Sequence, residues 1–118
     1  MHGFCHIELP TTDLDKAQTF YGGLFGWQFM PIPGMDYRVF NAGEGAVGGG
    51  IQKVAAISQT EGAYSYVEVE DIPAILAKVK ELGGKVVQEK QVLPDASWGA
   101  VGVLAAPDGY RVGLWSKS

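Results

Sequence analysis

An internal repeat, which covers both halves of the chain, constrains the fold more than any single motif does. The first copy is residues 6–29, HIELPTTDLDKAQTFYGGLFGWQF, and the second begins near Ser65 as SYVEVEDIPAILAKVKELGGKVV. A shift of 58 positions places Asp13 on Asp71 and Gly26 on Gly84, so the start and the stop of one helical segment coincide. Because the period is about half of the 118 residues, we expect two copies of one module and not a solenoid.

The spacing of apolar residues changes within the first copy from a strand pattern to a helix pattern. On the expected first strand, His6, Glu8 and Pro10 share one side, and Ile7 and Leu9 share the other. Polar residues follow, with a Thr12-x-x-Asp15 pattern that resembles a capping box and indicates a helix start. The next apolar residues recur at helical spacing and give the helix one apolar face: Leu14, Ala17, Phe20, Tyr21 and Leu24.

The remaining strand and turn signals give both halves the order strand–helix–strand–strand–strand. In the first half the expected strands are residues 4–9, 27–31, 37–40 and 47–54, and the expected helix is 13–24. In the second half the expected strands are residues 64–69, 86–90, 98–104 and 110–115, and the expected helix is 72–82. We therefore expect one α+β domain of two βαβββ modules, residues 1–54 and 64–118, joined by a linker at 55–63.

A single helix can cover only one face of a four-stranded sheet. We therefore expect the two modules to place their curved sheets around a central cavity, which is the default site for a ligand.

Composition and charge exclude several classes of protein. The sequence shows neither the roughly 18 apolar residues that span a bilayer nor a signal peptide, so we expect a soluble, cytoplasmic protein with no membrane partner. The single cysteine, Cys5, fits a reducing compartment. The formal net charge of −4 and the lack of a Lys/Arg cluster argue against a nucleic-acid partner.

Three phrases carry a resemblance to a known family: ELPTTDLDKAQTFYGGLFGW, VGGGI and APDGYRVGLW. Together with the two βαβββ modules, they resemble the vicinal oxygen chelate superfamily, which holds glyoxalase I, extradiol dioxygenases and bleomycin-resistance proteins. They are similar to its subgroup of small proteins related to lactoylglutathione lyase. The resemblance covers essentially the whole chain, and it implies a glyoxalase-like fold whose cavity binds a small organic molecule.

The resemblance also implies where metal ligands would stand. Metal-using members place one ligand near the start of the first strand and one in the last strand of each module, and the corresponding positions here are His6, Gly50, Ser65 and Gly113. Only His6 is a good ligand, whereas a catalytic zinc usually takes three protein ligands. We therefore predict no metal site, no cofactor and no glyoxalase I activity. A divalent metal held by His6, Glu8 and another residue is the alternative.

His6 and Glu8 share one side of the first strand, and we expect them to be the catalytic acid and base. One alternative is a half-buried His6 that is satisfied by a neighbour. Another is an ion pair between Glu8 and either Arg38 or Arg111. The repeat gives the two residues counterparts in the second half, Ser65 and Val67.

The expected ligand-binding residues surround the positions of the missing metal ligands. Gly50 and Gly113 carry no side chain, so we expect a roomier and less polar cavity than a metal site would leave. Trp115 would wall this cavity, Arg111 would bind an anionic group of the ligand, and Ser65 would contact the ligand. A surface role for Arg111 is the alternative.

Three functional hypotheses follow from these residues. The first is an enzyme of lyase or isomerase type without the usual four-ligand metal site, which His6 and Glu8 favour. The second is a non-catalytic protein that sequesters a small molecule, as bleomycin-resistance proteins do, and the third is an accessory domain that joins a partner. The acidic net charge favours a cationic ligand. We also expect a homodimer, because exposed sheet edges on small modules are commonly covered by a second copy.

Overall fold

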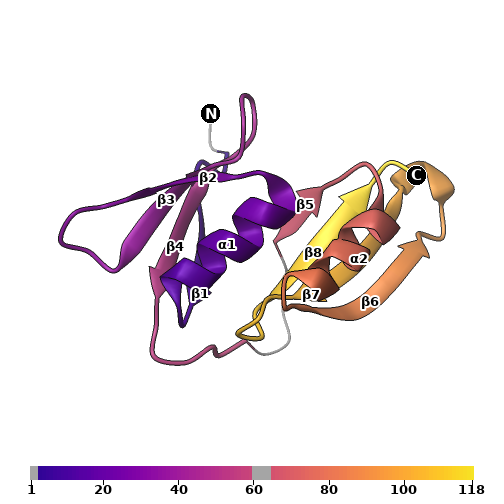
Figure 1. Cartoon of the computed structure of the whole chain (residues 1–118). Coiled ribbons are helices and arrows are strands. Elements are labelled where there is room, and N and C mark those ends of the chain that lie inside the picture. Colours follow the sequence, from indigo (N-terminus) through magenta and orange to yellow (C-terminus); the bar gives the residue numbers. More distant parts are fainter. Residues whose placement is uncertain (1–2, 60–64) are drawn as a thin grey trace. The chain divides into compact units, whose positions relative to one another are not determined.

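The computed structural model describes residues 3–59 and 65–118, which fall into two compact units, Met1–Ile57 and Ser58–Ser118 (Figure 1). Module one, in the first unit, contains β1 (Ile7–Thr11), α1 (Leu14–Phe25), β2 (Gln28–Pro31), β3 (Tyr37–Asn41) and β4 (Gly49–Lys53). Module two, in the second unit, contains β5 (Tyr66–Glu68), α2 (Ile72–Glu81), β6 (Lys85–Val92), the short 3₁₀ helix η1 (Ala96–Trp98), β7 (Ala100–Ala105) and β8 (Arg111–Ser116). The α+β class and the βαβββ repeat are confirmed.

The two sheets have the same topology. Their strand orders are β1-β4-β3-β2 in module one and β5-β8-β7-β6 in module two. In each sheet the first strand runs parallel to the last, and the other neighbouring pairs are antiparallel. The last strand of each module therefore lies inside its sheet, between the first and the third strands.

Both helices begin at an aspartate that caps free backbone N–H groups. The Asp13 carboxylate accepts a hydrogen bond from the Lys16 backbone N–H at 3.0 Å, and Asp71 accepts one from Ala74 at 3.1 Å. The cap of α1 is thus Asp13, and the predicted capping box at Thr12 is wrong by one residue. The two caps lie at equivalent positions of the repeat, as the shift of 58 requires.

The two helices end differently. Gly26 takes a left-handed conformation with φ of 75° after α1, and its N–H donates to the Gly22 carbonyl at 2.9 Å. After α2 the left-handed residue is Gly83, with φ of 88°, and the predicted stop at Gly84 lies one residue too late.

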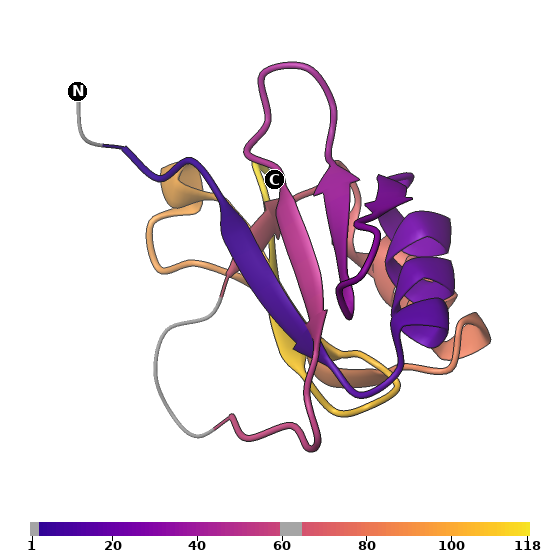
Figure 2. The ribbon, with the colours of Figure 1, turned by 90° about the vertical axis from the view of Figure 1, so that its left-hand side faces the viewer.

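Each helix buries its apolar face on one side of its own sheet, and Figure 2 shows α1 to one side of its strands. The buried residues of α1 are Ala17, Phe20, Tyr21 and Leu24, and those of α2 are Ile72, Leu76 and Val79. The buried strand residues of the two cores include Leu9, Phe40 and Ile51 in module one and Leu104, Val112 and Leu114 in module two. Within the described residues of each module, the module's own helix leaves the opposite face of the sheet uncovered, as the sequence predicts.

Several predicted boundaries shift in the structure. The predicted strand 47–54 is β4, which begins only at Gly49, and the predicted strand 86–90 is the longer β6. Trp98 ends η1 and does not begin a strand, because the Asp95 carboxylate accepts hydrogen bonds from Ser97 and turns the chain there. The predicted linker 55–63 and strand 64–69 include residues 60–64, which lie outside the described residues. Neither α1 nor α2, the α-helices of the described ranges, is long and apolar enough to cross a membrane.

Candidate functional site

The sheet face of module one that α1 does not cover is called here the open face of module one. Its members follow from the strand register, in which Glu8 lies opposite Gly50 on one side and Val39 lies opposite Gly50 on the other. These residues point away from Leu9 and Ile51, which are 2% and 0% exposed beneath α1. The open face therefore presents Glu8 beside a strand position that has no side chain.

The side chain of Tyr37, at the start of β3, lies over Gly50, the strand position that has no side chain. A Cβ atom built on Gly50 would overlap the end of the Tyr37 phenol ring, so the ring occupies the space where another residue would carry a side chain. The Tyr37 Oη lies 2.7 Å from the His6 Nε2, and the two rings are stacked with centroids 6.5 Å apart. His6 is exposed, so the alternative of a half-buried histidine is wrong, although the neighbour that this alternative required is present in Tyr37.

The pKa of the Tyr37 phenol is raised above its usual value of about 10. Partial burial is the largest cause, and a hydrogen bond with Glu8 and the charge of the Glu8 carboxylate add to it. Tyr37 therefore keeps its proton at neutral pH, between an imidazole on one side and a carboxylate on the other. The three residues His6, Tyr37 and Glu8 are called here the Tyr37 cluster.

The Tyr37 cluster can move a proton or orient a polar ligand. A protonated phenol donates a hydrogen bond to a ligand oxygen, and a neighbouring carboxylate or imidazole accepts a proton from the same ligand. His6 and Glu8 are exposed and Tyr37 is half-buried, so a molecule from solvent reaches all three.

Arg38 does not pair with Glu8. Its guanidinium lies on the α1 side of the sheet, where it forms an ion pair with Asp15 at 2.6 Å and donates to the Gln18 side-chain oxygen at 2.8 Å. The predicted alternative of a Glu8–Arg38 ion pair is therefore wrong. The pairing of Glu8 with Arg111 would join the two units, and it stays a prediction.

The uncovered sheet face of module two, called here the open face of module two, has a different composition. Its register pairs Tyr66 with Gly113 and Glu68 with Trp115. A Cβ atom on Gly113 would meet the ring of Tyr66, so a tyrosine again fills the space above a strand glycine. The aromatic ring comes here from the first strand of the module, whereas in module one it comes from the third.

This register corrects one prediction about the second half. Tyr66, and not Val67, is the counterpart of Glu8, because Tyr66 lies opposite Gly113 as Glu8 lies opposite Gly50. Val67 lies opposite Leu114, which is fully buried beneath α2. Ser65 and Val67 alternate with Tyr66 and so belong to the helix side of the sheet. They are therefore not on the face that corresponds to His6 and Glu8, and a ligand contact of Ser65 stays a prediction.

Trp115 has a fixed orientation at the end of β8. Its indole N–H donates to the Trp98 carbonyl at 2.8 Å, and a Cβ atom on Gly99 would lie 2.9 Å from the same nitrogen. Arg111 begins β8 and is exposed, while its backbone N–H and carbonyl bind the Gln59 side chain. Within the described part of the chain, the Arg111 guanidinium has no hydrogen-bonding partner.

The four positions that the family uses for metal ligands do not fit a metal here. Gly50 and Gly113 have no side chain, and the rings of Tyr37 and Tyr66 cover them. The Nε2 of His6 is engaged by Tyr37. Across residues 3–59 and 65–118, no three His, Cys, Asp or Glu side chains gather as a metal site would require. The expectation that the two glycines leave open space is wrong, because tyrosine rings fill it.

The sequence interpretation missed Tyr37 and Tyr66. A signal for both was present, because a glycine inside a strand often marks a close approach by another group. An aromatic residue on a neighbouring strand is the usual group that fills such a gap. Choosing the right tyrosine needs the cross-strand register, which local periodicity does not supply.

Comparisons with known proteins agree with this architecture. Residues 4–43 match the family described as bleomycin resistance protein-like N-terminal. A glyoxylase-like domain-containing protein of Didymella fabae is 35% identical over 97 residues, which cover 72% of each chain. The chain is a glyoxalase-like protein of the vicinal oxygen chelate superfamily. The resemblance predicted from the sequence is confirmed.

The glyoxalase-like chain is also similar to larger proteins and to solved structures. It is 29% identical over 131 aligned positions to CFP32 of Mycobacterium tuberculosis, which carries a provisional glyoxylase name, and it spans only 44% of the length of that relative. The fosfomycin resistance protein FosX of Listeria monocytogenes has a TM-score of 0.80 at 14% identity, covering 100% of this chain and 95% of its own. A glyoxalase I mutant of Zea mays has a TM-score of 0.71 at 20% identity, covering 96% and 45%. At these identities the structures establish the fold alone.

Proposed function

We propose that this glyoxalase-like protein binds a small organic molecule at the Tyr37 cluster and acts on it as an enzyme of lyase or isomerase type. No four-ligand metal site takes part in this proposal. The observation that carries it is the hydrogen bond of 2.7 Å between Tyr37 Oη and His6 Nε2, with Glu8 raising the pKa of the same phenol.

The chemistry follows from the division of roles within the cluster. Tyr37 donates a hydrogen bond to a carbonyl oxygen of the substrate, which stabilises the negative charge that develops there. Glu8 or His6 accepts the proton from the neighbouring carbon and returns it to that carbon or to the next one. Return to the next carbon gives isomerisation. Positioned acid–base groups of this kind typically contribute about 10²- to 10⁴-fold to a rate.

Sequestration without catalysis is the second candidate function. The match to the bleomycin resistance protein-like N-terminal family favours it, because the matched residues 4–43 include the whole Tyr37 cluster. On this proposal the same three side chains orient a bound molecule and no bond changes.

Deuterium exchange separates the two candidate functions. The purified chain is incubated in D₂O with a panel of small carbonyl compounds, an aldehyde, a ketone and a 2-oxo acid, and NMR follows exchange of the C–H beside the carbonyl. We expect faster exchange of at least one compound, and a fall of about 10²-fold in Tyr37→Phe. Tyr110→Phe is the matched control, because it removes a phenol hydroxyl in module two and should leave the rate unchanged.

The outcome decides between catalysis and sequestration. Compounds that shift the melting temperature of the wild type, but exchange no deuterium, would support sequestration and contradict the enzyme. Equal exchange in Tyr37→Phe and the wild type would remove Tyr37 from the mechanism. A stoichiometric Ni, Zn, Fe or Mn content that disappears in His6→Ala would contradict the proposal that no metal takes part.

The sequence also places proposed ligand contacts in module two. Arg111 and Trp115 are proposed ligand contacts, with Gly113 and Gly50 allowing the tyrosine rings to lie close to their sheets, and Ser65 is kept as a lesser candidate. Gly113→Trp is a direct test, because it would displace Tyr66. If the folded variant kept every ligand-induced melting shift of the wild type, the ligand would lie elsewhere.

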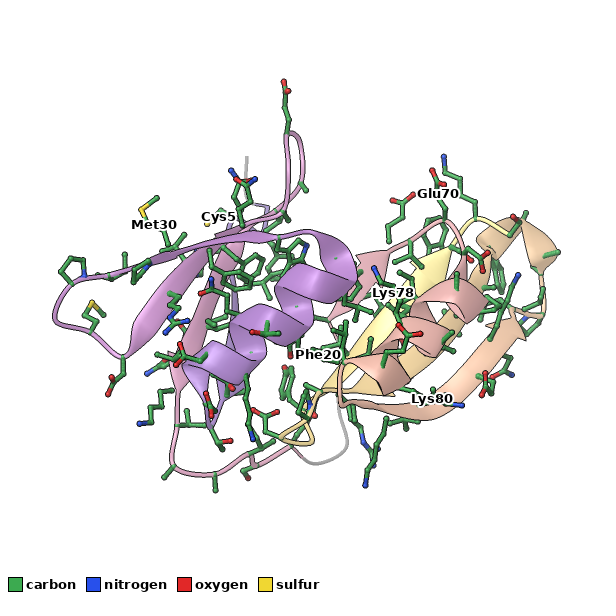
Figure 3. All side chains as sticks on the ribbon, in the orientation of Figure 1. Cys5, Phe20, Met30, Glu70, Lys78 and Lys80 are labelled. Atoms are coloured by element: carbon green, nitrogen blue, oxygen red, sulfur yellow. The ribbon has the colours of Figure 1, made fainter. Side chains whose placement is uncertain are left out.

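We also propose that the protein is a cytoplasmic homodimer with no nucleic-acid partner. Exposed apolar side chains on module one support a dimer, among them Phe4 at 94% and Met30 at 65% exposure. Figure 3 shows Met30 projecting outward from β2. Light scattering at micromolar concentration tests this proposal, and a clean monomer would contradict it.

A further inference from the structure

The open face of module two carries a second cluster of aromatic and acidic side chains that the Tyr37 cluster does not involve. Tyr66 and Glu68 lie two residues apart on β5 and so point to the same side of the sheet. Gly113 and Trp115 lie directly opposite them on β8. Neighbouring strands are about 4.8 Å apart, so the Cα atoms of Glu68 and Trp115 are neighbours, and the Trp115 indole N–H is held by the Trp98 carbonyl.

Two of these side chains are accessible to a ligand and one is held in place. Tyr66 is 52% exposed, Glu68 is exposed and Trp115 is half-buried. The indole of Trp115 is fixed by its hydrogen bond to the Trp98 carbonyl and by the close approach of Gly99. An aromatic surface that is already ordered loses little conformational entropy when a ligand settles on it.

Two exposed carboxylates, Glu68 and Glu70, and one exposed ammonium group, Lys117, lie at this end of β5 and β8, so acidic groups outnumber basic ones there. Within the part of the chain that the structure describes, Glu68 has no ion-pair or hydrogen-bonding partner, so its charge is not neutralised by a neighbour. Arg111, the cationic residue at the start of β8, lies four residues before Trp115, which is roughly 13 Å along a strand. That distance is longer than the screening length of about 8 Å at physiological salt, so Arg111 does not cancel the local charge.

We propose that Tyr66, Glu68 and Trp115 form a binding site for a small organic cation, an ammonium group with apolar substituents. Such a group is attracted to the faces of tyrosine and tryptophan rings by their quadrupoles and to a carboxylate by its charge. Its apolar substituents cover aromatic surface that is otherwise in contact with water. This proposal rests on the ligand contact proposed above for Trp115 and adds the chemical class of that ligand, but it does not depend on the acid–base role proposed for Tyr37.

A matched pair of probes tests the charge requirement. Choline and 3,3-dimethyl-1-butanol have nearly the same shape, but only choline carries a positive charge. The full-length chain, labelled with ¹⁵N, is titrated with each probe, and NMR follows the indole N–H of Trp115, which Trp115→Phe identifies by the loss of its signal. We expect choline to shift this signal with saturation at millimolar concentration, and we expect the neutral alcohol to bind at least fivefold more weakly.

Two substitutions test the residues. Glu68→Gln should weaken choline binding about threefold, and more at low salt, because one exposed charge pair is lost. Trp115→Leu should weaken it about tenfold, measured by the melting shift at fixed choline. Glu81→Gln is the matched control, since it removes an exposed carboxylate at the end of α2, on the other side of the sheet, and should leave the affinity unchanged.

Each outcome bears on the proposal. Equal affinity for the two probes would show an apolar surface with no preference for a cation and would overturn it. The same weakening in Glu68→Gln and Glu81→Gln would show a general effect of net charge and would also overturn it. If Trp115→Leu does not fold, Tyr66→Leu gives an independent test, because it removes an aromatic ring of a residue that is 52% exposed and should weaken choline binding while Glu68 stays intact.

Discussion

The two modules share one scaffold and carry different side chains on the faces that their helices leave open. In module one, Tyr37 covers Gly50 and joins a histidine and a carboxylate through its hydroxyl group. In module two, Tyr66 covers Gly113 and shares its sheet face with Trp115, and the described residues of this module include no histidine. The glycine–tyrosine contact therefore belongs to the shared architecture, and the chemistry depends on what surrounds the tyrosine. The open face of module one is thus polar, and the open face of module two is aromatic.

We expect the largest loss of stability from substitutions in the hydrophobic cores, and these substitutions test whether the two modules have equivalent cores. Ile51 in β4 and Leu114 in β8 are both fully buried beneath a helix. We expect Ile51→Ala and Leu114→Ala to lower the free energy of unfolding by about 2–5 kcal/mol each. Urea unfolding followed by circular dichroism measures both. A cost under about 1 kcal/mol in one of them would show that the two cores are not equivalent.

A smaller effect is expected from the strand glycines, which test the contact that the modules share. Gly50→Ala and Gly113→Ala should each cost about 1–3 kcal/mol, because the tyrosine ring must move away from the sheet. Only Gly50→Ala should also break the hydrogen bond to His6, which the imidazole NMR signals report. If Gly50→Ala left both the stability and the His6 signals unchanged, the placement of Tyr37 described above would be wrong.

We expect the smallest change in stability from tyrosine ionisation, because the pKa of one tyrosine in each module is raised, for reasons that differ between the modules. The pKa values of Tyr37 and Tyr110 are both raised, Tyr37 by partial burial and by Glu8, and Tyr110 in module two by burial. Since the folded-state pKa lies above the unfolded value of about 10, this contribution to stability is complete below pH 10. It is lost as the pH rises through the folded-state pKa.

Ultraviolet titration of single-tyrosine variants measures the contribution of Glu8. We expect Glu8→Gln to lower the pKa of Tyr37 toward its ordinary value and to leave that of Tyr110 unchanged, because the substitution removes a negative charge beside Tyr37 alone. A Tyr37 pKa that did not respond would show that burial accounts for the whole shift.

The scaffold could be predicted from the sequence because its signals are local and occur twice. The helix start at Asp13 and Asp71 and the one-sided apolar pattern appear in both copies at the same shift. Each copy thus supports the interpretation of the other, and together they give the βαβββ order and the uncovered sheet faces.

The site could be predicted only in part, because its contacts depend on how strands pair. His6 and Glu8 are two positions apart in the sequence, so strand alternation alone predicts that they share one side. Tyr37 reaches them from a strand some 30 residues later in the chain, through a register that periodicity does not determine. In module two the strand β5 has only three residues, and an error of one position made Val67, and not Tyr66, the predicted counterpart of Glu8. The shift of 58 that aligns the helices also places Glu8 on Tyr66, which is the counterpart that the structure shows.

The position of the last strand in each module has a consequence for how the protein is made. Ile7 pairs with Gly49, and Tyr66 pairs with Gly113. The backbone groups of the first strand of a module therefore form their sheet hydrogen bonds only after the last strand has been synthesised. During translation, a ribosome therefore exposes an unpaired strand edge and one side of a helix until the end of each module emerges. Such edges are where nascent chains associate wrongly. The short period of the repeat limits this exposure to about fifty residues at a time, at the usual 5–20 residues per second.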